Sequence, residues 1–195
     1  ALKHADKTMP NHFREDHTSW HVVSYNNDGT VESKQTFQGK NDDSAWSRGQ
    51  AWGLYGYTAV YRETSDRKYL DFAQAIADMF IERTTTEDGI PYWDFDAPAG
   101  EDTPRDASAA AVAACGMLEL STMTENGEKY FNQAEKILKS LSSDAYLAAP
   151  GENQGFVLMH STGSLAHGSE ICGAEALLLG CTHFPYFKAA LAQRT

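Results

Sequence analysis

Most of the chain has the apolar and polar pattern of amphipathic helices, in which one face is buried and the other is exposed. The predicted helices cover residues 1–13, 45–63, 66–83, 104–122 and 128–141. Residues that favour helix starts precede three of these segments, which supports the division. These residues are Asp43 or Ser44 for the second helix, Ser65 or Asp66 for the third, and Thr103 followed by Pro104 for the fourth.

One segment near the start departs from the helical pattern. WHVVSYNNDGTVESKQTF, residues 20–37, has two arms that favour β-strands around Asn26, Asn27, Asp28 and Gly29. Adjacent Asn, Asp and Gly residues are typical of tight hairpin turns. The segment therefore predicts a short β-hairpin in an otherwise all-α chain.

The helical part contains an internal repeat. SDRKYLDFAQAIADMF (Ser65–Phe80) is similar to NGEKYFNQAEKILKSL (Asn126–Leu141), with Tyr69 and Tyr130 in matching places. Each copy follows a helix that is rich in small residues. Repeated helix pairs are typical of α-solenoids and closed α/α toroids, in which loops at one end line a pocket. We expect one domain over residues 1–195.

The composition of the chain excludes some classes of binding partner and indicates its compartment. The net charge of −11 argues against a nucleic acid, because binding phosphates requires clustered Lys and Arg. No apolar run approaches the roughly 20 residues of a membrane span, so no membrane partner is expected. The three cysteines form no CxxC pair, which favours a reducing compartment. We therefore expect a cytoplasmic protein, or a periplasmic one if a signal lies upstream of Ala1. No zinc, nucleotide-loop or nucleophile-elbow motif is present, so neither a metal nor a cofactor is expected.

WSRGQAWGLYGY, residues 46–57, is the most informative stretch. At 100° per residue, Arg48 and Trp52 lie one turn apart on the same side of the helix. Gly49, Gly53 and Gly56 form a smooth stripe that costs helix stability, which the close approach of another helix would offset. One interpretation is core packing with Arg48 pointing to solvent. The other is a sugar-binding wall, because tryptophan rings stack on sugars and a guanidinium binds a carboxylate.

Other polar residues also leave two interpretations open. Asp94, Asp96, Asp102 and Asp106 follow one another in or beside the loop YWDFDAPAGEDTPRD. Paired carboxylates can hydrolyse glycosides, but they can also cap helices and pair with Arg105, and we favour this structural role. By residue type alone, His21 and His160 read as surface or packing residues.

The motifs together resemble a known family. DDSAWSRGQAWGLYGYTAVYRET, PYWDFDAP, DTPRDASAAAVAA, HSTG and the HVV that follows REDHTSW are similar to the unsaturated glucuronyl hydrolases, glycoside hydrolase family 88. They come in the family's order over residues 1–171. The resemblance implies the C-terminal part of a six-hairpin α/α toroid. It also implies an oligosaccharide substrate that carries a 4,5-unsaturated uronic acid at its non-reducing end, and hydrolysis that begins with hydration of the double bond.

The resemblance also assigns residues. His21, Gln38, Trp46, Arg48 and Trp52 match the family's substrate-binding positions, which favours the sugar-wall interpretation. The family's catalytic aspartates are expected upstream of Ala1, so no catalytic residue is assigned within the chain. The alternative function is therefore a carbohydrate-binding or assembly half-domain that lacks the general acid.

The end of the chain departs from the family. Residues 172–195, CGAEALLLGCTHFPYFKAALAQRT, form a divergent tail in which LLLGCTHFP resembles the cysteine phrase of glutamate and aspartate racemases.

Half of a toroid would expose the apolar flanks of its helices. We therefore expect self-association, or pairing with the missing N-terminal half, and no hydrolysis by the chain alone.

Overall fold

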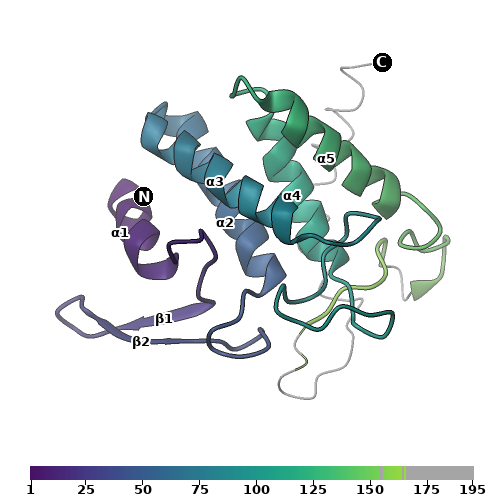
Figure 1. Ribbon diagram of the computed structural model, residues 1–195, viewed down its shortest axis with the longest axis horizontal. Coiled ribbons are helices and arrows are strands. Elements are labelled where there is room, and N and C mark those ends of the chain that lie inside the picture. Colours follow the sequence, from purple (N-terminus) through teal and green to yellow (C-terminus); the bar gives the residue numbers. More distant parts are fainter. Residues whose placement is uncertain (154–155, 164, 166–195) are drawn as a thin grey trace.

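The computed structural model describes residues 1–153, 156–163 and 165. The described part is helical apart from one two-stranded antiparallel sheet, which confirms the prediction of an all-α chain with a hairpin (Figure 1). The predicted tail, residues 172–195, lies outside the described residues. In chain order the elements are α1 (Leu2–His12), β1 (Val22–Tyr25), β2 (Val31–Gln35), α2 (Ser47–Thr64), α3 (Arg67–Arg83), α4 (Ala107–Leu120) and α5 (Gly127–Leu141).

The helices form two layers, with α3 and α5 in front of α2 and α4 in Figure 1. Helices α2 and α4 run parallel, because Arg48 pairs with Asp106 near their first turns and Arg62 pairs with Glu119 near their last turns. Helix α4 is buried on nearly all sides by virtue of its run of alanines. A Cβ added at Gly116 of α4 would lie only 3.2 Å from the backbone of α2, so the two helices pack closely.

The same pair of contacts joins α3 to α1 and α5 to α3, so α1 precedes them in the front layer. In both α3 and α5, a Lys-Tyr pair at the start of the helix binds an aspartate of the preceding front helix. Helix α1 is therefore to α3 what α3 is to α5, which confirms the internal repeat. The distances are 2.8 Å for Tyr69 Oη–Asp6 Oδ1, 2.7 Å for Lys68 Nζ–Asp6 Oδ1, 2.9 Å for Tyr130 Oη–Asp78 Oδ1 and 2.7 Å for Lys129 Nζ–Asp78 Oδ1.

The predicted start of α2 is wrong. Trp46 occupies the N-cap position without a side-chain hydrogen bond, and neither Asp43 nor Ser44 caps the helix. The Ser44 hydroxyl instead donates to the Asp94 carboxylate at 2.7 Å. This competing bond draws the segment into a turn and delays the helix until Ser47.

The predicted start of α4 at Thr103 and Pro104 is also wrong. The Pro104 carbonyl accepts a hydrogen bond from the Trp93 amide at 3.0 Å, within a short antiparallel bridge between residues 92 and 105. The segment before α4 is therefore extended, and Asp106 becomes the N-cap through its bond with the Ala109 amide. For α3, the prediction of Asp66 as the cap is confirmed.

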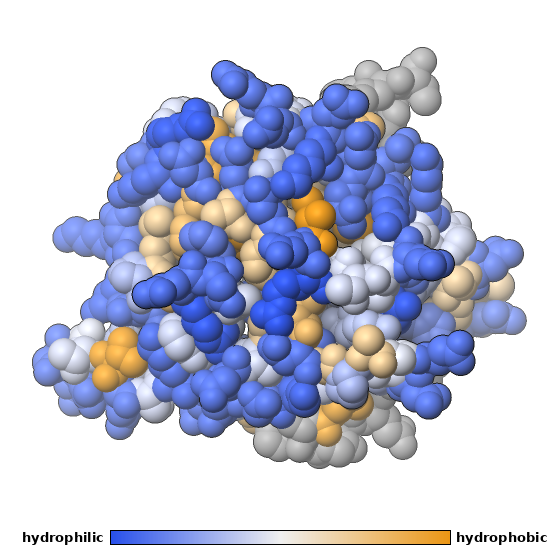
Figure 2. All heavy atoms as spheres, viewed as in Figure 1, coloured by the Kyte–Doolittle hydropathy of each residue, from blue (hydrophilic) through white to orange (hydrophobic). Residues whose placement is uncertain are grey.

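The front face of the molecule is mostly hydrophilic, with apolar atoms visible in the seams between elements (Figure 2). This distribution follows from α3 and α5, which bury one face each and present charged residues on the other. None of the helices in the described part is long and apolar enough to cross a membrane.

Candidate functional site

Arg48 and Asp106 form a buried ion pair between the first turns of α2 and α4. The Arg48 Nη2 and Nε atoms lie 2.9 Å and 3.1 Å from Asp106 Oδ2. The two side chains are 2% and 0% exposed, so the interpretation that Arg48 points to solvent is wrong. Burial raises the pKa of the Asp106 carboxyl, and the positive charge of Arg48 opposes that rise.

The segment around the HSTG phrase, residues 160–163, is bound to the start of α4. The Ala107 amide donates to the His160 carbonyl at 3.0 Å, and the Ser108 amide donates to Ser161 Oγ at 3.2 Å. These bonds satisfy amides that a helix leaves unpaired at its N-terminus. The segment thereby becomes a fixed strap across the ends of α2 and α4.

Two of the predicted binding residues meet at this strap. Arg48 Nη2 donates to the Thr162 carbonyl at 2.7 Å, and Gln38 Nε2 donates to the Gly163 carbonyl at 3.0 Å. Gln38 comes from the loop after β2 and Arg48 from α2, so elements far apart in sequence converge on adjacent carbonyls. The sequence motifs marked the strap as a landmark but gave no sign of this contact.

His21 is held as a neutral ring in a defined tautomer. Its Nδ1 accepts hydrogen bonds from the amides of Phe37 and Gln38, both at 3.1 Å, so the proton resides on Nε2. Burial lowers the pKa of His21 below its ordinary value of 6.5, which keeps the ring neutral at pH 7. The ring packs on Trp46, with the two centroids 4.5 Å apart.

His21, Trp46 and Trp52 line a cavity of about 410 Å³ between α1 and α2. Trp46 is 7% exposed, and among the described residues its buried indole Nε1 has no hydrogen-bond partner. Trp52 is only partly buried and so presents more of its ring. The cavity therefore brings together three of the five predicted residues, whereas Gln38 and Arg48 meet at the strap.

The glycine stripe of α2 lines the same cavity. A Cβ at Gly53 would lie 2.8 Å from the Phe13 ring, whereas one at Gly56 would meet nothing within 4 Å. At Gly49 the nearest atom belongs to Trp46, at 3.2 Å. Within the described part of the chain, the prediction that a neighbouring helix packs on this stripe therefore holds only at Gly53, where Phe13 is the C-cap residue of α1 and Ile76 of α3 would lie 3.8 Å from the Cβ.

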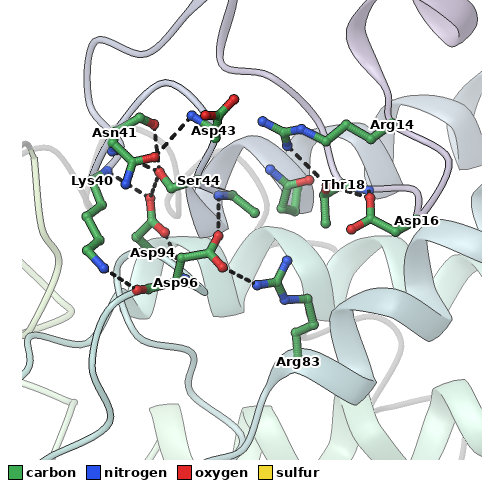
Figure 3. Close-up of polar contacts among 12 residues, drawn as sticks. Arg14, Asp16, Thr18, Lys40, Asn41, Asp43, Ser44, Arg83, Asp94 and Asp96 are labelled. Carbon is green, nitrogen blue, oxygen red and sulfur yellow. Dashed lines mark hydrogen bonds and ion pairs between the residues drawn. The ribbon is translucent and has the colours of Figure 1, made fainter.

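Two of the loop aspartates bind residues 40–45, which follow Gln38 in the chain, and Figure 3 shows their contacts with Lys40 and Ser44. The fully buried Asp94 accepts bonds through Oδ2 from the Lys40 amide at 2.9 Å and from Ser44 Oγ at 2.7 Å. Asp96 accepts a bond from the Ala45 amide at 2.8 Å and pairs with Arg83 at 2.6 Å. The structural role that we favoured for these two residues is confirmed.

The remaining aspartates differ from the prediction in one respect. Arg105 pairs with Asp88 at 3.0 Å and not with an aspartate of its own loop. Asp102 is exposed, and Asp106 binds Arg48. In the part of the chain that the structure describes, no three His, Cys, Asp or Glu side chains lie close enough to hold a metal ion.

The arrangement is that of a helical glycosyl hydrolase. A model of glycosyl hydrolase family 76 matches residues 3–152, and the chain belongs to that family as the model defines it. This family number differs from the number 88 that the sequence motifs implied, although both families are glycoside hydrolases.

More specific comparisons place the chain among the unsaturated glucuronyl hydrolases. The unsaturated glucuronyl hydrolase of Formosa agariphila is 43% identical over 94% of this chain and 46% of its own length. A crystal structure of an unsaturated glucuronyl hydrolase specific for heparin has a TM-score of 0.86 and 48% identity, covering 96% of this chain and 53% of that one. The resemblance drawn from the sequence is confirmed, and this chain spans about half the length of those relatives.

A third similar structure contains a ligand. It is a variant of the unsaturated glucuronyl hydrolase of Streptococcus agalactiae, complexed with dGlcA-GalNAc6S. Its TM-score is 0.76 and its identity is 28%, and the match covers 94% of this chain and 51% of that one.

Proposed function

We propose that this chain supplies the sugar-binding part of an unsaturated glucuronyl hydrolase. Its substrate class is the oligosaccharide with a 4,5-unsaturated uronic acid at the non-reducing end, which is hydrolysed by hydration of the double bond. The names of the relatives and the bound disaccharide of the Streptococcus agalactiae structure support this substrate. The observation that carries the proposal is the convergence of Gln38 and Arg48 on one strap, at the ends of two parallel helices.

The predicted residues supply complementary chemistry. Arg48 carries the positive charge for the uronate carboxylate, and Trp52 offers an aromatic face for the sugar ring. His21 donates a hydrogen bond from Nε2 without adding a charge. Gln38 lies beside His21, since the backbone amide of Gln38 donates a hydrogen bond to Nδ1 of that ring. The Trp46 ring packs on the His21 ring and is itself only 7% exposed.

Hydration of the double bond needs a proton donor, and the loop aspartates are poorly placed to provide it. Asp94 and Asp106 are fully buried and accept several hydrogen bonds each. Asp96 is bound to Arg83 and to the backbone. We therefore propose that the 195-residue chain binds the unsaturated sugar without turning it over, which corresponds to the alternative of a non-catalytic carbohydrate-binding or assembly half-domain.

Two measurements test this function. Calorimetric titration with an unsaturated chondroitin disaccharide measures binding, and the fading of the ultraviolet absorbance of the double bond measures turnover. We expect binding without fading for this chain, and fading under the same conditions for the similar unsaturated chondroitin disaccharide hydrolase of Streptococcus agalactiae. Turnover by the 195-residue chain would show that one of its own carboxylates is the acid.

The binding of this sugar should weaken in acid because His21 must stay neutral. Unfolded histidine gains a proton near pH 6.5, whereas His21 in the folded chain gains one only at lower pH. Its contribution to stability is therefore complete above about pH 6.5 and is lost as the pH falls through the folded pKa. We expect denaturant unfolding to show lower stability, and titration to show weaker binding, at about pH 5 than at about pH 7.5.

His21→Gln is the control, because glutamine keeps an oxygen acceptor but does not titrate. Its stability should change less between the two pH values. His12, whose pKa burial also lowers, contributes equally to both proteins. An identical pH dependence in the wild type and the variant would contradict a role for His21.

We also propose that the chain completes its helical layer by association, either with a second copy or with the part of the longer relatives that it does not match. The support comes from matching positions in α2 and α4. Gly116, the tenth residue of α4, packs against the backbone of α2. Gly56, the tenth residue of α2, has nothing within 4 Å of an added Cβ. A ring of six hairpins would fill that space with a further helix.

Light scattering tests the association. We expect the wild-type chain to dimerise with rising concentration and Gly56→Leu to remain monomeric, because the leucine fills the open face. Gly100→Leu, which also meets nothing within 4 Å but lies in a loop, is the matched control. A wild-type chain that stays monomeric at all concentrations would contradict self-association.

The cytoplasmic location also remains a proposal. The buried free thiol of Cys115 and a sequence without a CxxC pair support a reducing compartment. Cell fractionation of the source organism, followed by detection of the protein, would test it.

A further inference from the structure

Asp106 uses its two carboxylate oxygens for different tasks. Oδ1 accepts the Ala109 amide at 3.1 Å and thereby caps α4. Oδ2 accepts both bonds from the Arg48 guanidinium. The side chain is fully buried, so its negative charge is compensated mainly by these partners.

The guanidinium of Arg48 is consequently fixed in two directions. Asp106 holds Nε and Nη2 from the side of α4, and the Thr162 carbonyl holds Nη2 from the side of the strap at 2.7 Å. A planar guanidinium with charged and neutral acceptors on defined edges has little rotational freedom left. Among the described residues, α4 and the strap therefore both help to set its orientation.

The strap extends this control to Gln38. Thr162 Oγ1 donates to the Arg105 carbonyl at 3.1 Å, directly before Asp106, so the strap and the carboxylate share one foundation. The neighbouring Gly163 carbonyl accepts a hydrogen bond from the side-chain amide of Gln38. A movement of the start of α4 would shift both Arg48 and Gln38.

We infer that Asp106 is a positioning residue of the sugar site: it acts through Arg48 to orient the guanidinium for the uronate carboxylate. The inference rests on the proposed function, in which Arg48 receives that carboxylate. Asp106 does not contact the sugar in this scheme. Its charge keeps the desolvated guanidinium compensated and aligned before the ligand arrives, which lowers the cost of ordering upon binding.

Asp106→Asn separates the charge from the cap. Asparagine is as good an N-cap as aspartate, so α4 keeps its start, but an amide no longer offers the guanidinium a charged acceptor. We expect the 195-residue chain to bind an unsaturated chondroitin disaccharide roughly tenfold to a hundredfold more weakly after this change. The methyl ester of the same disaccharide lacks the carboxylate and should bind the two proteins equally.

The ester comparison distinguishes positioning from a structural role, because a damaged site would lose both ligands alike. Asp66→Asn is the matched control, since Asp66 caps α3 through its side chain and its helix lies outside the sugar site. This variant should bind both ligands as the wild type does. Equal losses for the acid and the ester in Asp106→Asn, or no loss for either, would overturn the inference.

A second variant covers the case in which Asp106→Asn does not fold. Arg48→Lys keeps a positive charge beside Asp106 but loses the forked donor geometry. It should show the same selective loss for the acid. Equal affinity of this variant and the wild type for the acid would also overturn the inference.

A ligand-free measurement separates this inference from the proposed function. The Nε–H signal of Arg48 in a nitrogen-correlated NMR spectrum reports an ordered guanidinium. We expect a slowly exchanging signal in the wild type and rapid exchange in Asp106→Asn. If the wild-type chain binds neither ligand, the proposed function fails, and an Arg48 signal that is unchanged by Asp106→Asn would overturn the positioning role on its own.

Discussion

Replacing Arg48 with alanine should lower the free energy of unfolding by about 3–5 kcal/mol, because the Asp106 carboxylate would then be buried without its partner. Removing a sugar-binding arginine from a surface would cost almost no stability. The structure therefore changes what the variant is expected to show, since Arg48 is 2% exposed and Asp106 is 0% exposed. Sugar binding should be lost at the same time.

The stability loss is measured by denaturant unfolding, and two controls interpret it. Arg62→Ala removes an ion pair to Glu119 between the same two helices, but at 46% and 22% exposure, so it should cost at most about 1 kcal/mol. The double variant Arg48→Met with Asp106→Asn removes both charges and keeps an N-cap side chain for α4. It should recover most of the stability while sugar binding stays lost. A loss below about 1 kcal/mol for Arg48→Ala would show that the pair does not form in solution.

Elements whose signals are local could be predicted from the sequence. The helices, the hairpin and the repeat of Lys-Tyr pairs followed from periodicity and from turn chemistry. The two wrong helix starts have a shared cause, because Ser44 and Pro104 are good local start signals but each hydrogen-bonds to a residue outside its own segment. Ser44 donates to Asp94, 50 positions later. The Pro104 carbonyl accepts from the Trp93 amide, in the strand-like segment before it. Long-range hydrogen bonds of this kind leave no trace in a local pattern.

The sequence proposed residues for the candidate site but not their arrangement. The motifs pointed to His21, Gln38, Trp46, Arg48 and Trp52. Three of these residues line one cavity, and Gln38 and Arg48 bind the strap. Asp106 was read as a residue of the first turn of a helix, which is close to its capping role. Its second role, as the partner of Arg48, depends on the parallel packing of α2 and α4, which no spacing within either helix encodes.

That packing can be tested at Gly116, where we expect the second large effect. A leucine there would place its Cβ 3.1 Å from the Leu54 side chain and 3.2 Å from the backbone of Tyr55. Because a helix backbone cannot move aside as a side chain can, Gly116→Leu should lower the free energy of unfolding by at least about 3 kcal/mol, despite its better helix propensity.

Gly56→Leu makes the same chemical change at the tenth residue of the other inner helix. A Cβ at Gly56 meets nothing within 4 Å, so only the propensity gain of up to about 1 kcal/mol should remain. Thermal and denaturant unfolding of dilute protein, where association is negligible, should therefore rank Gly56→Leu above the wild type and Gly116→Leu far below it. Comparable stability of the two variants would mean that α2 and α4 are not in close contact. It would then also contradict the Arg48–Asp106 pair, which joins the first turns of the two helices at the candidate site.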